Sequence, residues 1–280
     1  MRSWKILGDL KPDAVCGFGG YGAFAVVCAA IVRGMPTIIH EQNVVPGRAN
    51  RLLAAGVRRV AISSRESEKF FNPKKLVWTG CPSRDLKVLH SRENIQQEFG
   101  LSSGRYTILV QGGSQGSQHI NQVFVAAAEI LKKDFAIQVI HLAGGGNSET
   151  LKESYRSLGV SARVFDFLNE MEKAYAAADL VVARAGALTV TEIAQSRLPA
   201  VLIPYPYAGG HQIHNARVLV QLGCARIIEE QELTPQSLRD AVWAVKSDAI
   251  AQRAMNTSLG QEFPVNAAQR LAQEIVQLKK

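Results

Sequence analysis

Short runs of β-branched and other apolar residues alternate with helical patterns along nearly all of the 280-residue chain. This alternation restricts the fold more than any other feature of the sequence. Strands that alternate with helices are typical of βαβ units, in which the strands are parallel and helices cover the sheet. At about 150 residues per domain, the length favours two domains. The sequence therefore predicts an α/β protein with two parallel sheets.

The alternation falls into two unequal regions. The first offers strands at 13–16, 37–40, 59–63 and 76–79. The second offers strands at 107–111, 137–142, 163–165, 180–183, 200–203 and 225–228, which is enough for a complete doubly wound sheet.

From this pattern we predict four parts of the chain. They are a first domain at 1–88, a linker at 89–104, a second domain at 105–262, and a C-terminal helix at 263–280 that packs back on the first domain. The predicted linker is polar and irregular. The C-terminal helix has an apolar face made of Ala268, Leu271, Ile275 and Leu278.

The chain carries 32 Lys and Arg against 24 Asp and Glu, a net charge of +8. This surplus favours phosphates, anionic lipid or nucleic acid, and it does not choose among them. A basic cluster in the first region predicts salt-sensitive binding to an anionic membrane surface, with a solvated basic face as the alternative. Its members are Arg48, Arg51, Arg58 and Arg59.

The longest apolar run, 23–32, is far shorter than the ~20 residues that cross a bilayer. We therefore expect at most peripheral membrane contact. The same run could equally form a buried helix. The cysteines are scattered without a regular spacing, which favours a reducing cytoplasm over a disulfide framework.

Two segments are placed to meet an anion. The sequence GGSQGS at 112–117 follows a predicted strand and opens a predicted helix, where glycines let a phosphate approach the backbone closely. A tight turn without a ligand is the alternative. The segment 186–192 stands in the same position after another strand, and it ends in Glu192. Glu192 either caps its helix or accepts hydrogen bonds from a ribose.

Polar clusters follow two further strands. The sequence HEQN at 40–43 has more polar side chains than a loop needs for capping, so we interpret it as functional. His211 and His214 open a helix, but no Cys or carboxylate neighbour completes a metal site. We therefore expect polar ligand contact or a surface helix there, and no metal.

Together these segments resemble a known family. The sequence is similar to the bacterial glycosyltransferases that add N-acetylglucosamine to undecaprenyl-diphospho-muramoyl-pentapeptide, the last cytoplasmic step in making the peptidoglycan lipid precursor. The matching segments, in the family's order, are GGY at 19–21, HEQNVVPG at 40–47 with ANR at 49–51, GGSQG at 112–116, RAGALTVTE at 184–192 and HQIHNA at 211–216.

The resemblance implies a glycosyltransferase-B fold of two doubly wound, Rossmann-like domains. UDP-N-acetylglucosamine (UDP-GlcNAc) would bind mainly to the second domain and the lipid acceptor to the first. It implies an inverting transfer without cofactor or metal, at the cytoplasmic face of the inner membrane, by a peripheral protein with no nucleic-acid partner.

The resemblance also implies roles for single residues. Asn43 and Gln212 would lie near sugar hydroxyls, and Arg84 near the diphosphate. Ser114 would contact phosphate, and the backbone of Leu168 the uracil. The diphosphate and ribose would be lined by Ala187, Leu188, Thr189, Val190, Thr191 and Glu192, with Glu192 on the ribose hydroxyls.

The sequence departs from the family in one important respect. The family begins with a further strand and a GGTGGH-type loop, whose histidine is the usual candidate for the general base, and the 280 residues contain no such loop. We therefore expect a first domain truncated at its N-terminus, and the general base stays unidentified. Two alternatives remain open: a related glycosyltransferase with another lipid acceptor, against which HEQN argues, and a nucleotide-sugar-binding module without catalysis.

Overall fold

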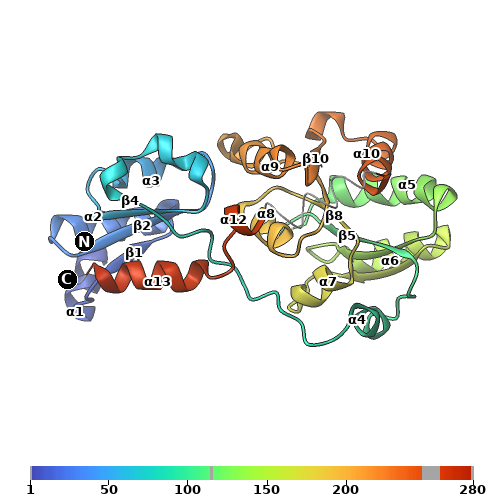
Figure 1. Ribbon diagram of the computed structural model, residues 1–280, viewed down its shortest axis with the longest axis horizontal. Coiled ribbons are helices and arrows are strands. Elements are labelled where there is room, and N and C mark those ends of the chain that lie inside the picture. Colours follow the sequence, from blue (N-terminus) through green and yellow to red (C-terminus); the bar gives the residue numbers. More distant parts are fainter. Residues whose placement is uncertain (1, 114–115, 248–258, 279–280) are drawn as a thin grey trace. The chain divides into compact units, whose positions relative to one another are not determined.

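The computed structural model describes residues 2–113, 116–247 and 259–278, and the chain divides into two units (Figure 1). One unit comprises Met1–Ser83 together with Gly260–Lys280, and the other comprises Arg84–Leu259. Each of the predicted strands is present, and its ends lie within two residues of the prediction. None of the described helices combines the length and the apolar character that spanning a membrane requires.

The first unit contains a four-stranded parallel sheet in the order β1-β2-β3-β4. Its strands are β1 (Val15–Gly17), β2 (Thr37–Glu41), β3 (Arg59–Ile62) and β4 (Leu76–Trp78). Its helices are α1 (Arg2–Leu10), α2 (Gly20–Val32), α3 (Arg48–Leu53) and α13 (Ala267–Gln277), with short 3-10 turns η1 (Arg65–Phe70) and η2 (Pro73–Lys75).

Helices cover both faces of this sheet. Ile39, on one face of β2, packs in a core with α1, α2 and α3, and the neighbouring Ile38 packs on the other face with α13. This is the period of two that a strand buried on both faces requires. The apolar run 23–32 therefore lies within a helix that contributes to the core, with Val27 and Ala30 buried.

The C-terminal helix packs on the first unit through Leu271 and Leu278, with Ile275 partly buried beside them. The predicted apolar face is shifted at its start, because Ala267 is buried and Ala268 is exposed.

The second unit contains a six-stranded parallel sheet in the order β10-β9-β8-β5-β6-β7. Its strands are β5 (Tyr106–Gln111), β6 (Ile137–Leu142), β7 (Ser161–Phe165), β8 (Leu180–Ala183), β9 (Ala200–Leu202) and β10 (Ala225–Ile227). Its helices are α4 (Arg92–Glu98), α5 (Gln118–Asp134), α6 (Ser148–Leu158), α7 (Met171–Ala177), α8 (Ala187–Gln195), α9 (His211–Gln221) and α10 (Pro235–Ser247), with turns η3 (Ala208–Gly210) and η4 (Glu230–Glu232). Helix α12 (Leu259–Glu262) spans the division between the units.

The strand order of the second sheet fixes where a ligand can bind. The chain runs from β5 outward to β7 on one side, and then returns to β8, which pairs with β5 on the other side. The loops after β5 and β8 therefore leave the sheet in opposite directions. In open α/β sheets this switch point leaves a crevice at the carboxyl ends of the two strands.

The structure differs from the predicted linker. Residues 92–98 form α4, in which Ile95 and Gln96 are buried, and Gln96 donates hydrogen bonds to Thr107 Oγ1 and the Ala177 carbonyl. The segment therefore belongs to the second unit, which begins at Arg84. The segment was predicted to be an irregular linker because it is mostly polar. So short a helix needs only one or two buried residues to pack against the unit, and the rest of its residues can be polar.

Candidate functional site

A cavity of about 650 Å³ lies at the carboxyl ends of β5 and β8 in the second unit. Its size is typical of small-molecule sites. It brings together six of the residues that the family resemblance singles out: Arg84, Leu168, Leu188, Thr189, Glu192 and Gln212.

The glycine loop after β5 forms one wall of this cavity. A Cβ atom on Gly112 would lie 2.3 Å from the backbone nitrogen of Ser117, so only glycine fits there. Gly113 has a φ of 90°, in the left-handed region that favours glycine. Ser117 caps α5 by accepting a hydrogen bond from Ile120 N. Ser114 lies outside the described residues.

The start of α8 forms a second wall. The first hydrogen bond within the helix runs from Val190 N to the Gly186 carbonyl, so the N–H groups before it point out of the helix start. The first turn contains no acidic residue. Leu188 and Thr189 line the cavity, whereas the side chains of Val190 and Thr191 are buried within the unit and do not line it. Ala187 is half-buried at the helix start.

Glu192 does not cap its helix, because it stands in the second turn of α8. One carboxylate oxygen accepts a hydrogen bond from Arg84 Nε at 3.0 Å, and the other accepts from the Tyr175 hydroxyl at 3.1 Å. Gln111 Nε2 in turn donates to that hydroxyl at 2.8 Å. Burial raises the pKa of Tyr175, so the phenol keeps its proton and remains a donor. The capping interpretation is therefore wrong, and Glu192 presents a fixed carboxylate at the cavity.

Arg184, directly after β8, is buried and joins the two walls. Its guanidinium donates to Ser117 Oγ at 3.0 Å, to the Ile203 carbonyl at 3.2 Å and to both carboxylate oxygens of Glu230. Although burial opposes it, hydrogen bonds from Arg184 and from His119 lower the pKa of Glu230. No role for Arg184 was predicted from the sequence, although its place at the end of a core strand was a usable signal.

The loop after β7 closes the remaining side. Asp166 accepts hydrogen bonds from Ser148 N at 3.1 Å and Ser148 Oγ at 2.8 Å, which ties the loop to the start of α6. These hydrogen bonds lower the pKa of Asp166. Next to it, Phe167 lines the cavity and is 68% exposed. An exposed aromatic ring inside a cavity offers a flat surface for a ligand, and this residue was not predicted from the sequence.

Gln212 lies at the first turn of α9. Its side-chain oxygen accepts hydrogen bonds from Ala185 N and Tyr205 N, both at 3.0 Å. These bonds hold two loops at the cavity rim, so the oxygen is already engaged, and a ligand hydroxyl would meet the Nε2 donor.

The HEQN segment belongs to the first unit and is built around buried groups. Glu41 is 1% exposed, and its carboxylate accepts from the backbone nitrogens of Asn43 and Gly47 and from the side-chain amides of Asn43 and Asn50. His40 is fully buried and hydrogen-bonded to the Gly80 carbonyl, and burial lowers its pKa. Two of the four polar residues are therefore scaffold, and Asn43 is the one they hold in place.

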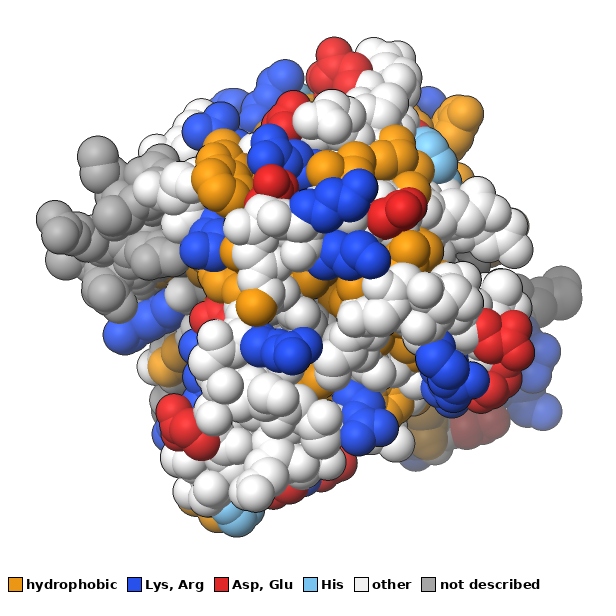
Figure 2. Space-filling model, turned by 90° about the vertical axis from the view of Figure 1, so that its right-hand side faces the viewer, with side chains coloured by type: hydrophobic (Ala, Val, Ile, Leu, Met, Phe, Trp, Pro, Cys, Tyr) orange, Lys and Arg blue, Asp and Glu red, His pale blue; other side chains and the backbone are white. Residues whose placement is uncertain are grey.

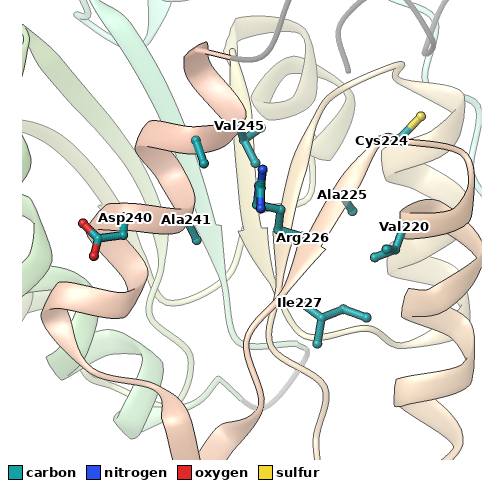
Figure 3. A pocket seen from close by; sticks show the side chains of 10 residues that line it. Val220, Cys224, Ala225, Arg226, Ile227, Asp240, Ala241 and Val245 are labelled. Carbon is teal, nitrogen blue, oxygen red and sulfur yellow. The ribbon is translucent and has the colours of Figure 1, made fainter. Parts of the chain in front are cut away.

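A second cavity, of about 740 Å³, lies beside the edge strand β10 between α9 and α10 (Figure 3). Figure 3 shows Arg226 between Val220 on one side and Ala241 and Val245 on the other. The lining is mostly apolar, and none of the residues predicted from the sequence belongs to it.

Within 2–113, 116–247 and 259–278, no three His, Cys, Asp or Glu side chains converge as metal ligands would. The charge of +8 is also not gathered in one place on the face that Figure 2 shows, where Lys and Arg side chains are interspersed with Asp and Glu.

Comparison with known proteins gives one consistent family. Residues 107–271 match the glycosyltransferase family 28 C-terminal domain, and residues 1–62 match its N-terminal domain. A UDP-N-acetylglucosamine–N-acetylmuramyl-(pentapeptide) pyrophosphoryl-undecaprenol N-acetylglucosamine transferase of Halothermothrix orenii is 42% identical over 248 residues, which cover 85% of this chain and 67% of the relative. The transferase of the same name from Bacillus subtilis is 36% identical over 283 residues, which cover 100% of this chain and 77% of the relative.

Solved structures agree. The crystal structure of Acinetobacter baumannii MurG superimposes with a TM-score of 0.80 at 30% identity, covering 98% of this chain and 77% of that one. The expected glycosyltransferase-B fold of two parallel α/β units is therefore confirmed. With both domain models matched and these identities over most of its length, the chain belongs to glycosyltransferase family 28, among the N-acetylglucosamine transferases that these relatives represent.

Proposed function

We propose that the protein transfers N-acetylglucosamine from UDP-GlcNAc to the lipid-linked N-acetylmuramyl-pentapeptide, the reaction named for its relatives, and so serves peptidoglycan synthesis. The observation that carries the proposal is the cavity at the β5–β8 switch point. It combines a glycine loop that a phosphate can approach closely, outward-pointing backbone N–H groups at the start of α8, a fixed carboxylate and an exposed aromatic ring. Diphosphate, ribose and uracil each require one of these features.

The nucleotide would occupy the cavity in one orientation. The glycine loop and the start of α8 suit the diphosphate, because backbone N–H groups and the positive end of a helix dipole favour an anion. Glu192 would accept hydrogen bonds from the ribose hydroxyls. Phe167 would contact the uracil face, and the Leu168 backbone its polar edge. Each assignment places a ligand group against a protein group that suits its chemistry: an anion against N–H donors, hydroxyl donors against a carboxylate, and a flat base against an aromatic ring.

Nucleotide binding would break the ion pair between Arg84 and Glu192. The Arg84 guanidinium now pairs with Glu192, and the Arg84 side chain is 44% exposed. When ribose hydroxyls take their place on the carboxylate, Arg84 would turn to the nearby diphosphate, where its charge has a stronger partner. The ion pair thus keeps both groups ordered before the substrate binds.

Two amides would recognise the sugar. Gln212 Nε2 would donate to a sugar hydroxyl, and Asn43 would contribute a carboxamide that both donates and accepts. Asn43 is suited to this because Glu41 holds its backbone nitrogen at 2.9 Å and its side-chain nitrogen at 3.2 Å. Ser114 and Ala187 would add contacts to the phosphates.

In the reaction, a hydroxyl of the acceptor sugar attacks the anomeric carbon of N-acetylglucosamine. The new carbon–oxygen bond forms as the bond to the UDP oxygen breaks, and the configuration inverts. The acceptor loses one proton, and UDP leaves with the bonding electron pair. The groups around the diphosphate would stabilise the negative charge that develops on the leaving group.

The test is an assay of the whole chain with radiolabelled UDP-GlcNAc and the undecaprenyl-diphosphate-linked acceptor. We expect labelled lipid and UDP in equal amounts, and less of both with Glu192→Ala when UDP-GlcNAc is supplied below its KM. Binding of UDP-GlcNAc without labelled lipid would support the alternative, a nucleotide-sugar-binding module. Labelling of a different lipid in preference would support a related transferase.

We also propose that the protein works at the cytoplasmic face of the inner membrane as a peripheral protein, because its acceptor is a lipid. Arg48, Arg51, Arg58 and Arg59 are all exposed on the first unit. Leu52, which follows Arg51 in the chain, is 69% exposed and gives the first unit an apolar residue at the surface. Each basic residue near an anionic surface contributes about 1 kcal/mol, and salt screens it. Binding to vesicles of anionic lipid should therefore weaken as salt rises, and salt-independent sedimentation would contradict the electrostatic part.

A further inference from the structure

Three buried polar side chains lie behind the glycine loop, away from the cavity surface. They are Asn121 on α5, His141 on β6 and Tyr155 on α6, with exposures of 3%, 0% and 1%. The Tyr155 hydroxyl lies 2.7 Å from His141 Nδ1, and His141 Nε2 lies 3.0 Å from Asn121 Oδ1. Asn121 Nδ2 then donates to the Ala143 carbonyl at 2.9 Å. The side chains form one continuous chain of hydrogen bonds.

Only one arrangement of protons satisfies every member of this chain. Because the Ala143 carbonyl can only accept, Asn121 must present its nitrogen there and its oxygen to His141. His141 Nε2 therefore carries the proton, and Nδ1 accepts from the Tyr155 hydroxyl. The imidazole is then neutral, which agrees with burial lowering the pKa of His141 to about 3. A buried network satisfied in this way is rigid.

The chain ends at an atom that the glycine loop touches. A Cβ atom on Gly116 would lie 2.4 Å from the Ala143 carbonyl oxygen and 2.9 Å from Gly144 Cα. The Ala143 nitrogen donates to the Phe165 carbonyl at 2.8 Å, so Ala143 is held from two directions. Gly116 itself lines the cavity. The position of this carbonyl therefore sets how far the glycine loop can withdraw from the cavity.

We propose that His141 is a positioning residue for the nucleotide sugar: through Asn121 it fixes the Ala143 carbonyl, and with it the Gly116 turn that faces the diphosphate. The inference rests on the proposed function, since it assumes that UDP-GlcNAc occupies this cavity. It assigns a role in the reaction to side chains that never touch the substrate.

The same strand supplies a matched control. Gln138 is as deeply buried as His141, and it donates hydrogen bonds to Thr107 Oγ1 and the Ser102 carbonyl, both at 2.9 Å. It lies at the opposite end of β6, about 10 Å away at the rise of a strand. Its loss should cost stability without reaching the glycine loop.

The experiment compares His141→Leu with Gln138→Leu in the whole chain. We expect both to lower the thermal unfolding midpoint. Only His141→Leu should raise the Kd for UDP and the KM for UDP-GlcNAc, by about tenfold or more, because small displacements of positioning groups are costly. The KM for the lipid acceptor should not change. Tyr155→Phe, which removes one hydroxyl and keeps the ring, serves as the milder variant if His141→Leu does not fold, and it should shift the Kd in the same direction.

A ligand-free measurement separates this inference from the proposed function. The backbone amide resonances of Gly112, Gly113 and Gly116 should shift in His141→Leu or Tyr155→Phe and stay in place in Gln138→Leu. If the wild-type chain does not bind UDP, the proposed function fails, and these resonances still test the positioning role. Unshifted resonances, or an equal rise in Kd for the Gln138 variant, would overturn it.

Discussion

Replacing Glu192 by alanine should weaken nucleotide binding and lower the stability of the fold only modestly. A hydrogen bond to a charged acceptor contributes about 1.5–3 kcal/mol, but the Arg84 contact must be given up when the ribose binds. A net loss of roughly 1–3 kcal/mol follows, which corresponds to about a 5- to 150-fold rise in the Kd for UDP and UDP-GlcNAc alike.

The cost to the free energy of unfolding should be no larger than the loss in binding. The ion pair with Arg84 is 44% exposed on the arginine side, and such pairs contribute about 0.2–1 kcal/mol. Tyr175 would keep its hydrogen bond from Gln111. The free energy of unfolding should therefore fall by about 1–2 kcal/mol at most.

Calorimetric titration of UDP, combined with urea unfolding, measures both quantities. Glu98→Gln is the control, because Glu98 also pairs with a cation of the second unit, Lys173 at 2.9 Å, but does not line the cavity. It should leave the Kd unchanged. An unaltered Kd in Glu192→Ala would refute the ribose assignment and leave the carboxylate as a partner for Arg84 and Tyr175 alone.

Three further predictions follow from the same structure. Phe167→Ala should raise the Kd for UDP by the equivalent of about 1–3 kcal/mol, the stacking contribution of one base. Phe18→Ala in the first unit should leave that Kd unchanged. If calorimetry shows equal effects for the two variants, Phe167 does not contact the uracil. Asn43→Ala should weaken UDP-GlcNAc and leave UDP unchanged, and a parallel loss for both ligands would make Asn43 part of the scaffold. Burial lowers the pKa of His141 from 6.5 to about 3, so the unfolded chain takes up a proton on this imidazole at a higher pH than the folded chain does. The thermal midpoint should therefore fall as pH drops from about 6.5 towards 3. His141→Leu should flatten that fall, and a slope equal to the wild type would contradict the assignment.

The sheets were predictable because their signals are local. Each strand is a short apolar run bounded by glycine or polar residues, and the helix after β5 shows its period in the sequence. The segment 92–98 was not predictable in the same way. Its helix is stabilised by the hydrogen bonds of Gln96 to Thr107 and Ala177. These partners lie outside the segment, so the local sequence does not predict them.

The site was predictable in part. The glycine loop and the segment around Glu192 were found from their positions after core strands, before any likeness to a family was used. Arg84, Leu168 and Gln212 came from the resemblance alone. Phe167 and Arg184 were missed because an aromatic ring or an arginine beside a strand is usually packing or surface, and only the tertiary structure turns them towards one cavity. Glu41 stands in the HEQN segment that we interpreted as functional from its polar residues. In the structure its buried carboxylate instead holds Asn43 in place.

The central claim is that the cavity between the ends of β5 and β8 is the nucleotide-sugar site. A crystal structure of the whole chain with UDP-GlcNAc tests it most directly. We expect the ribose on the Glu192 carboxylate, the diphosphate between the glycine loop and the start of α8, and Arg84 moved from Glu192 to the diphosphate. Nucleotide bound elsewhere, for example in the cavity beside β10, with the Arg84–Glu192 pair intact, would contradict it.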